Sequence, residues 1–126
     1  MIHTLAIAFS DDANSTPVDY SSTQSGDGQT NLDVGIPSGS ANFSIACPID
    51  ISEIKSVLIN SDINATIQFK SGSSVIQSMA FSGNKPLIWQ AGFPNSNPIT
   101  GDVITAVNVV SATGDMAFKA YFLMDV

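Results

Sequence analysis

Apolar and polar side chains alternate with a period of two along most of this chain, and no other feature constrains its fold as strongly. The alternation runs through residues 4–9, 64–70, 74–81 and 116–124. Successive side chains of a β-strand point to opposite faces, whereas an amphipathic helix repeats its apolar positions every three to four residues. No long stretch shows the helical repeat. The chain is therefore predicted to be all-β.

Turn-forming clusters rich in Ser, Gly, Asn and Pro separate the strand-like runs. They divide the chain into nine candidate strands, at 4–9, 32–36, 41–47, 54–60, 64–70, 74–81, 86–91, 103–110 and 116–124. Eight or nine short antiparallel strands with regularly spaced turns predict a two-sheet β-sandwich that is jelly-roll-like. An immunoglobulin-like sandwich is the weaker alternative, because the single cysteine rules out its disulfide.

The length of 126 residues is that of a single domain. Residues 10–30 stand apart from the rest, because they are rich in Asp, Ser, Gly and Thr and offer only Val18 and Tyr20 for burial. A segment of this composition cannot form a core of its own. We expect a single β-sandwich domain over 1–126 with a flexible N-terminal loop or extended arm at about 10–30.

The charge balance excludes two classes of partner. The chain has four Lys, no Arg and eleven acidic residues, which gives a net charge of −7. Nucleic acids and anionic membrane surfaces both attract basic faces, so we expect neither as a partner. The N-terminal residues lack the basic and apolar regions of a secretory signal, and no apolar run is long enough for a membrane-spanning helix. These features predict a protein made in a cytoplasm.

Residues that could carry chemistry are few. His3 is the only histidine and Cys47 the only cysteine; we interpret the first as an exposed terminal residue and the second as a buried thiol. The acidic residues in turns fit turn chemistry, in which Asp bonds to nearby backbone; they are Asp27, Asp62, Asp102 and Asp115. We therefore expect a non-enzymatic protein with no catalytic, cofactor-binding or metal-binding residues.

Two weaker possibilities stay open. The stretch 11–14 is the densest in oxygen ligands, and Asp27 and Asp33 could join it to bind calcium. Trp89 and Phe93 could form an exposed aromatic pair that stacks on a sugar or anchors a protein interface, although Trp89 could equally fill the sandwich core.

The order of strands and turns carries a resemblance. It lies in the runs 33–40 (DVGIPSGS), 54–62 (IKSVLINSD), 65–72 (ATIQFKSG), 86–89 (PLIW), 98–103 (PITGDV) and the final LMDV. From about residue 30 to 126 the chain resembles the small jelly-roll virion proteins of tailed bacteriophages, in particular the capsid cement or decoration proteins. The resemblance is one of pattern, without a diagnostic motif.

The resemblance implies a protein that binds the outside of an assembled phage head, often as a homotrimer, and strengthens it without catalysis. Its partners would be the major capsid protein and copies of itself, its location the capsid surface of the virion, and its site of synthesis the host bacterial cytoplasm. In such families the terminal arm often carries the contact with the shell. No functional residues transfer, because the family has no catalytic set.

Two further hypotheses concern the strands through which copies of the chain would touch and the functions that compete with a decoration protein. The run 103–110, apolar on both faces, and the final strand are candidates for contacts between copies, to be tested by Val109→Asp or Val110→Asp. The alternatives to a decoration protein are a carbohydrate-binding or receptor-recognition module, in which Trp89 would respond to glycan, and a tail or baseplate component of the same fold.

Overall fold

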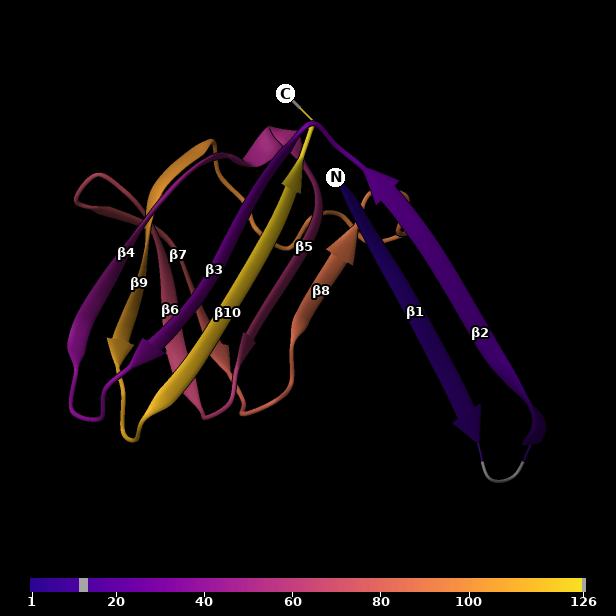
Figure 1. The fold of residues 1–126 in the computed structure, drawn as a ribbon, viewed down its shortest axis with the longest axis horizontal. Helices are drawn as coiled ribbons and strands as arrows, with labels where there is room; N and C mark the ends of the chain where they lie inside the picture. Colours follow the sequence, from indigo (N-terminus) through magenta and orange to yellow (C-terminus); the bar gives the residue numbers. More distant parts are fainter. Residues whose placement is uncertain (12–13, 126) are drawn as a thin grey trace.

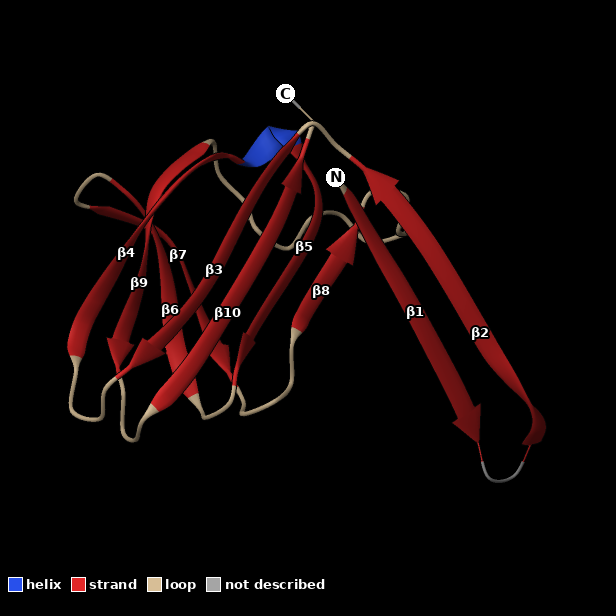
Figure 2. Ribbon diagram, viewed as in Figure 1, coloured by secondary structure: helices blue, strands red, loops and turns tan. Residues whose placement is uncertain are grey.

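The computed structural model of the chain describes residues 1–11 and 14–125, and the side chains of residues 11–18 lie outside that description. Strands account for nearly all of its regular structure (Figure 2). In chain order the elements are β1 (Ile2–Asp11), β2 (Asn14–Ser25), β3 (Gly28–Ile36), β4 (Ala41–Asp50), the 3₁₀ turn η1 (Ile51–Glu53), β5 (Ile54–Ser61), β6 (Ala65–Ser71), β7 (Ser74–Phe81), β8 (Leu87–Gln90), β9 (Val103–Ser111) and β10 (Met116–Met124).

Eight of these strands form the two sheets of a sandwich. One sheet has the order β3-β10-β5-β8 and the other the order β4-β9-β6-β7, and all neighbouring strands are antiparallel. The remaining strands, β1 and β2, form a hairpin of their own beside the sandwich (Figure 1). The predicted all-β sandwich is confirmed.

The strand order is that of a jelly roll. The first sandwich strand pairs with the last, β3 with β10, and the pairing continues inward through β4 with β9, β5 with β8 and β6 with β7. These four pairs are distributed alternately between the two sheets, which is how a long double-stranded ribbon wraps into two Greek keys. The jelly-roll-like order expected from the sequence is therefore present.

The core lies between the two sheets and is built from the inward-pointing residues of each strand. In β10 the predicted alternation holds, since Met116, Phe118, Ala120, Phe122 and Met124 are all buried. Phe69, Phe118 and Phe122 are the largest fully buried side chains. Burial of one such ring contributes about 1.5–3 kcal/mol of transfer free energy, so these residues account for much of the sandwich's stability.

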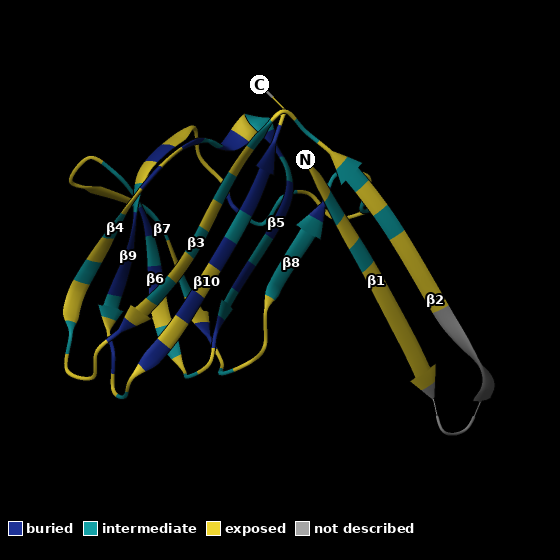
Figure 3. Ribbon diagram, viewed as in Figure 1, coloured by how far each residue is buried: buried dark blue, intermediate teal, exposed yellow. Residues whose placement is uncertain are grey.

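A second strand, which the periodicity did not predict, occupies most of residues 10–30. Residues 14–25 form β2 rather than a loop, and β3 begins at Gly28. The alternation gave no signal here, because β2 bonds to β1 and lies away from the core (Figure 3). We call the β1–β2 hairpin, residues 2–11 and 14–25, the arm; it projects past β8 on one side of the sandwich (Figure 1).

Glycine at position 26 allows the arm to join the sandwich closely. A β-carbon on Gly26 would lie 2.3 Å from the carbonyl oxygen of Met124 and 3.1 Å from Cγ of Leu123. Only a residue without a side chain fits against the end of β10 at this distance.

Within the described residues, no helix is long and apolar enough to cross a bilayer.

Candidate functional site

The arm is held on the sandwich by uncharged contacts along one of its faces. The pairing register places His3 opposite Gln24 and Ile7 opposite Tyr20, so these side chains lie on the same face. His3 Nδ1 lies 2.9 Å from Oγ of Ser56 in β5, and Gln24 Nε2 donates a hydrogen bond of 2.9 Å to the carbonyl oxygen of Ala91. No charged side chain takes part in these two contacts.

A cavity of about 250 Å³ lies between the base of the arm and the outer face of the sheet that contains β5, β8 and β10. Its lining residues are Ile2, His3, Thr4, Leu5, Ser56, Val57, Leu58, Ile88, Gln90 and Tyr121. Gln90 is 2% exposed, and its Nε2 donates to Ser56 Oγ at 3.3 Å. Ser56 therefore joins β8 to the arm, because the same hydroxyl contacts both Gln90 and His3.

The environment of His3 favours its neutral form. Burial lowers the pKa of His3 below its usual value of 6.5, and a neutral imidazole can accept the Ser56 hydroxyl proton at Nδ1. A serine beside a histidine forms two members of a catalytic triad, but the described residues that line this cavity include no carboxylate to orient the ring. The contact between the two side chains joins the base of the arm to β5. The expectation that His3 is an exposed terminal residue is wrong, since it is half-buried and bonded.

Farther from the sandwich, the same face of the arm carries an apolar stripe made of Leu5, Ile7, Phe9 and Tyr20. Exposure rises along it: Leu5 is half-buried, Ile7 is 43% exposed, Tyr20 42% and Phe9 70%. Most large apolar side chains of the described chain are at least half-buried, and those of the sandwich form a continuous core (Figure 3). The stripe is thus an apolar surface that starts under the sandwich and continues beyond it.

An apolar cleft lies where the stripe leaves the sandwich. It has a volume of about 240 Å³ and is lined by Ile7, Tyr20, Gly92, Phe93 and Pro94. The rings of Tyr20 and Phe93 meet edge to face, with centroids 5.7 Å apart and planes inclined by 72°, an arrangement that aromatic pairs prefer. Together the stripe and the cleft are the candidate functional site.

Trp89 belongs to the core side of the sheet rather than to this cleft. It pairs with the buried Val57 in the register of β5 and β8 and packs against the hydrophobic core. Its indole Nε1 donates a hydrogen bond of 2.9 Å to the carbonyl oxygen of Asn95. Of the two alternatives left open by the sequence, the structure supports core packing for Trp89, and Phe93 pairs with Tyr20 instead.

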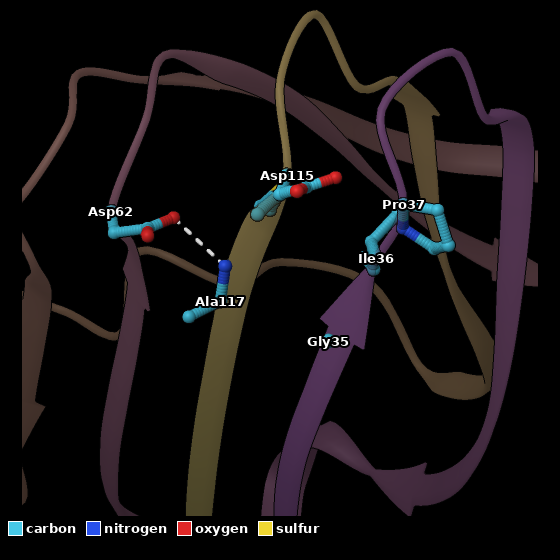
Figure 4. A pocket seen from close by; sticks show the side chains of 7 residues that line it. Gly35, Ile36, Pro37, Asp62, Asp115 and Ala117 are labelled. Atoms are coloured by element: carbon cyan, nitrogen blue, oxygen red, sulfur yellow. Dashed lines mark hydrogen bonds between the residues drawn. The ribbon is translucent and has the colours of Figure 1, made fainter.

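A separate cavity of about 440 Å³ lies at the other end of the sandwich, beside the start of β10 and the end of β3 (Figure 4). Two turn acids line it. Asp62 Oδ1 accepts the backbone N–H of Ala117 at 2.8 Å, and Asp115 Oδ1 accepts that of Ser38 at 3.0 Å. These carboxylates tie neighbouring turns together through bonds that span 55 positions for Asp62 and 77 for Asp115. The local turn chemistry predicted for them, in which Asp bonds the backbone two residues on, is therefore wrong for these two residues.

The last residues that the sequence offered for chemistry are Cys47 and the acidic side chains that could bind a metal. Cys47 is buried, and burial raises the pKa of its thiol to about 11, so it is the inert thiol that the sequence predicted. In the part of the chain that the structure describes, no three His, Cys, Asp or Glu side chains come together as metal ligands. The proposed calcium stretch at 11–14 lies outside the described side chains, so that possibility stays a prediction.

The run 103–110 does not form an exposed apolar face. It makes up most of β9, a central strand paired on both sides by β4 and β6. Ile104, Val107 and Val109 point into the core, and Val109 is 0% exposed. The hypothesis that Val109 lies at an interface between copies is wrong, because it already packs between the two sheets; Val110 is the half-buried residue on the outer face.

No protein-family model, curated protein or solved structure matches the chain. The description of the site therefore depends on its residues alone.

Sequence reasoning did not find Ser56, Gln90 or Tyr20 as site residues. Ser56 and Gln90 lie in strands whose apolar neighbours dominate the pattern, and their contact with the arm depends on long-range packing. Tyr20 was noted only as one of two buriable residues in 10–30. A signal was present in β1, where Leu5, Ile7 and Phe9 alternate as strongly as in a core strand while their partner strand is polar.

Proposed function

We propose that this chain is a non-enzymatic structural protein of a virus particle, specifically a decoration protein on the outside of a tailed-phage head, made in the host cytoplasm. The resemblance in strand and turn order supports the proposal, and the jelly-roll order is compatible with it. The acidic, Arg-free composition also suits an outer surface, because such a surface does not attract the packaged genome.

The observation that carries the proposal is the arm. An isolated two-stranded hairpin is marginally stable in water at best, yet this one extends beyond the sandwich with Phe9 70%, Ile7 43% and Tyr20 42% exposed. Contiguous exposed apolar surface is typical of protein–protein contacts. A rigid sandwich with an uncovered apolar arm is suited to assembly with neighbouring proteins in a particle.

Co-sedimentation tests this function. The purified chain is mixed with purified heads and, separately, with purified tails of the encoding phage, and bound protein is measured after centrifugation. The proposal expects saturable binding to heads at a fixed ratio to the major capsid protein. Binding to tails alone would favour the tail or baseplate alternative, and binding to neither would overturn a structural role on the particle.

A second candidate is carbohydrate recognition, which the Tyr20–Phe93 pair favours. Aromatic rings can stack on the apolar face of a sugar, and these two line an open cleft. A glycan array probed with the wild-type chain and with Tyr20→Ala tests it. Binding to a defined glycan that the substitution removes would support this candidate, and an array without signal would dismiss it.

A further inference from the structure

Strand β1 has few of the features that protect exposed strand edges, and those it has, Asp11 and a register shift between Phe9 and Asp11, lie at its far end. From Ile2 to Ser10 it contains no Asp, Glu, Lys, Pro or Gly, although natural sheets block open edges with charges, prolines, bulges or short strands. Two sandwich edges have such protection: β4 contains Pro48 and a register shift between Ala46 and Ile49, and β8 is only four residues long. The edge strand β7 also contains no Asp, Glu, Lys, Pro or Gly, but its pairing with β6 shifts register. A strand of ten residues with so little protection and an exposed apolar face is suited to being covered in the assembled state.

The same chain has both an exposed apolar side chain on the arm and an apolar cleft beside it. Phe9 is 70% exposed and lies two positions along the strand from Ile7, on the same face. The recess is the cleft of about 240 Å³ lined by Ile7, Tyr20, Phe93 and their neighbours. Since Phe9 stays exposed beside this cleft, the chain does not fill the cleft with its own ring.

We propose that the arm is a contact between copies of this chain, in which Phe9 of one copy enters the Tyr20–Phe93 cleft of another. The inference rests on the proposed role of the arm in assembly and names its partner. Two stripes that run antiparallel, with Phe9 of each copy opposite Ile7 of the other, bring each Phe9 ring to the cleft that Ile7 and Tyr20 line. Both copies then make the same contact, as a two-fold interface requires.

Charge favours a second copy as the occupant. Two chains that each carry −7 repel one another, so a contact between them has to exclude carboxylates. The described contact face meets that condition, because its residues from His3 to Phe9 and from Tyr20 to Gln24 are uncharged at neutral pH when His3 is neutral. Asp19 pairs with Ala8 and therefore lies on the opposite face of the arm. A basic partner would be better matched by an acidic face than by this neutral one.

The first test is the solution mass of the full chain, measured by size-exclusion chromatography with light scattering over a range of concentrations. The wild-type chain is expected to associate, and Phe9→Ser to raise the dissociation constant about a hundredfold, because a two-fold contact loses two buried rings. Val75→Ser is the matched control, since Val75 is also an exposed apolar strand residue but lies on β7. A wild-type chain that is monomeric at every concentration, or a Phe9→Ser variant that associates as before, would overturn the inference.

The second test locates the contact by cross-linking. A mixture of Ser10→Cys chains, which keep the Phe9 ring, and Pro94→Cys chains is expected to be joined by a bis-maleimide cross-linker, whereas Ser10→Cys mixed with Val75→Cys is not. The native Cys47 does not compete, because it is buried and its pKa is raised to about 11. Equal cross-linking in both mixtures, or none in the first, would contradict the contact.

These results separate the inference from the function on which it rests. If the wild-type chain is monomeric but binds heads, and Phe9→Ser loses that binding, the arm contacts the shell protein and only the contact between copies is wrong. If the chain associates through the arm but binds neither heads nor tails, the contact between copies is correct and the proposed structural role on the phage particle is wrong.

Discussion

His3 Nδ1 and Ser56 Oγ lie 2.9 Å apart although 53 positions separate the two residues in the chain. The contact joins the first strand of the arm to a central strand of the sandwich. Ser56 also accepts a hydrogen bond from Gln90 Nε2 at 3.3 Å, so a single buried hydroxyl connects β1, β5 and β8. The position of the arm thus depends on a few neutral side-chain contacts instead of a continuous strand ladder with the sandwich.

Replacing Ser56 by Ala is expected to loosen the arm. The substitution removes the partner of His3 and leaves the buried Gln90 amide without its acceptor, which costs about 1–3 kcal/mol. Amide hydrogen exchange measured by mass spectrometry should show faster exchange in residues 2–10, with little change in β10. Ser44→Ala, on the exposed side of β4, is the control, and unchanged exchange in β1 of Ser56→Ala would show that the contact does not hold the arm.

Attachment of the arm is expected to weaken as the pH falls. Burial lowers the pKa of His3 in the folded chain below 6.5, its value when the arm is released. Between these two pKa values the released form binds more protons, so the contribution of His3 is complete above about pH 6.5 and declines as the pH falls through the lowered pKa. Hydrogen exchange of β1 at pH values from about 7.5 down to about 5.5, corrected for intrinsic rates, measures this decline.

His3→Asn serves as the control for the pH experiment, because an amide can form a hydrogen bond without titrating in this range. A wild-type arm whose protection is as independent of pH as that of His3→Asn would contradict the prediction.

Adding one methyl group at position 26 is expected to displace the base of the arm. The β-carbon of Gly26→Ala would lie 2.3 Å from the Met124 carbonyl oxygen, a clash that requires the backbone to move and should cost about 1–3 kcal/mol. Thermal unfolding measures the loss. Gly35→Ala is the matched control, since nothing lies within 4 Å of its β-carbon; equal melting temperatures for the two variants would be inconsistent with close packing at Gly26.

Val109→Asp and Val110→Asp should have opposite consequences despite being adjacent. Val109 is fully buried between the sheets, and an unpaired carboxylate there is expected to prevent folding, because burying a lone charge is prohibitively unfavourable. Val110 lies on the outer face and is half-buried, so its variant should stay folded. Circular dichroism distinguishes the two outcomes, and a folded Val109→Asp chain would be incompatible with this core.

The sequence predicted those parts of the fold in which a strand has one buried face. In β10, the alternation of Met116, Phe118 and Phe122 with polar or small residues indicates both the strand and its inward side, because burial in a sandwich imposes that period. The turn clusters between such strands then suffice for the jelly-roll class. Strand β2 has no buried face in the core, so the same reasoning interpreted it as a loop or arm.

The candidate site was less predictable for a different physical reason. The contacts of His3 with Ser56 and of Tyr20 with Phe93 join segments far apart in the chain. Their geometry depends on how the arm packs against the sandwich. Local pattern carries no information about such packing. The alternation of Leu5, Ile7 and Phe9 is the exception, since it predicts an apolar face on β1 from the sequence alone.

A cryo-electron microscopy map of decorated phage heads would test the central claim most directly, which is that the arm is the assembly surface of this protein. An arm that serves as the assembly surface should give density in which Ile7, Phe9 and Tyr20 are covered by a neighbouring chain, with Phe9 against a Tyr20–Phe93 cleft where the neighbour is another copy. A map in which the protein contacts its neighbours only through the sandwich, with the stripe of the arm facing solvent, would contradict it.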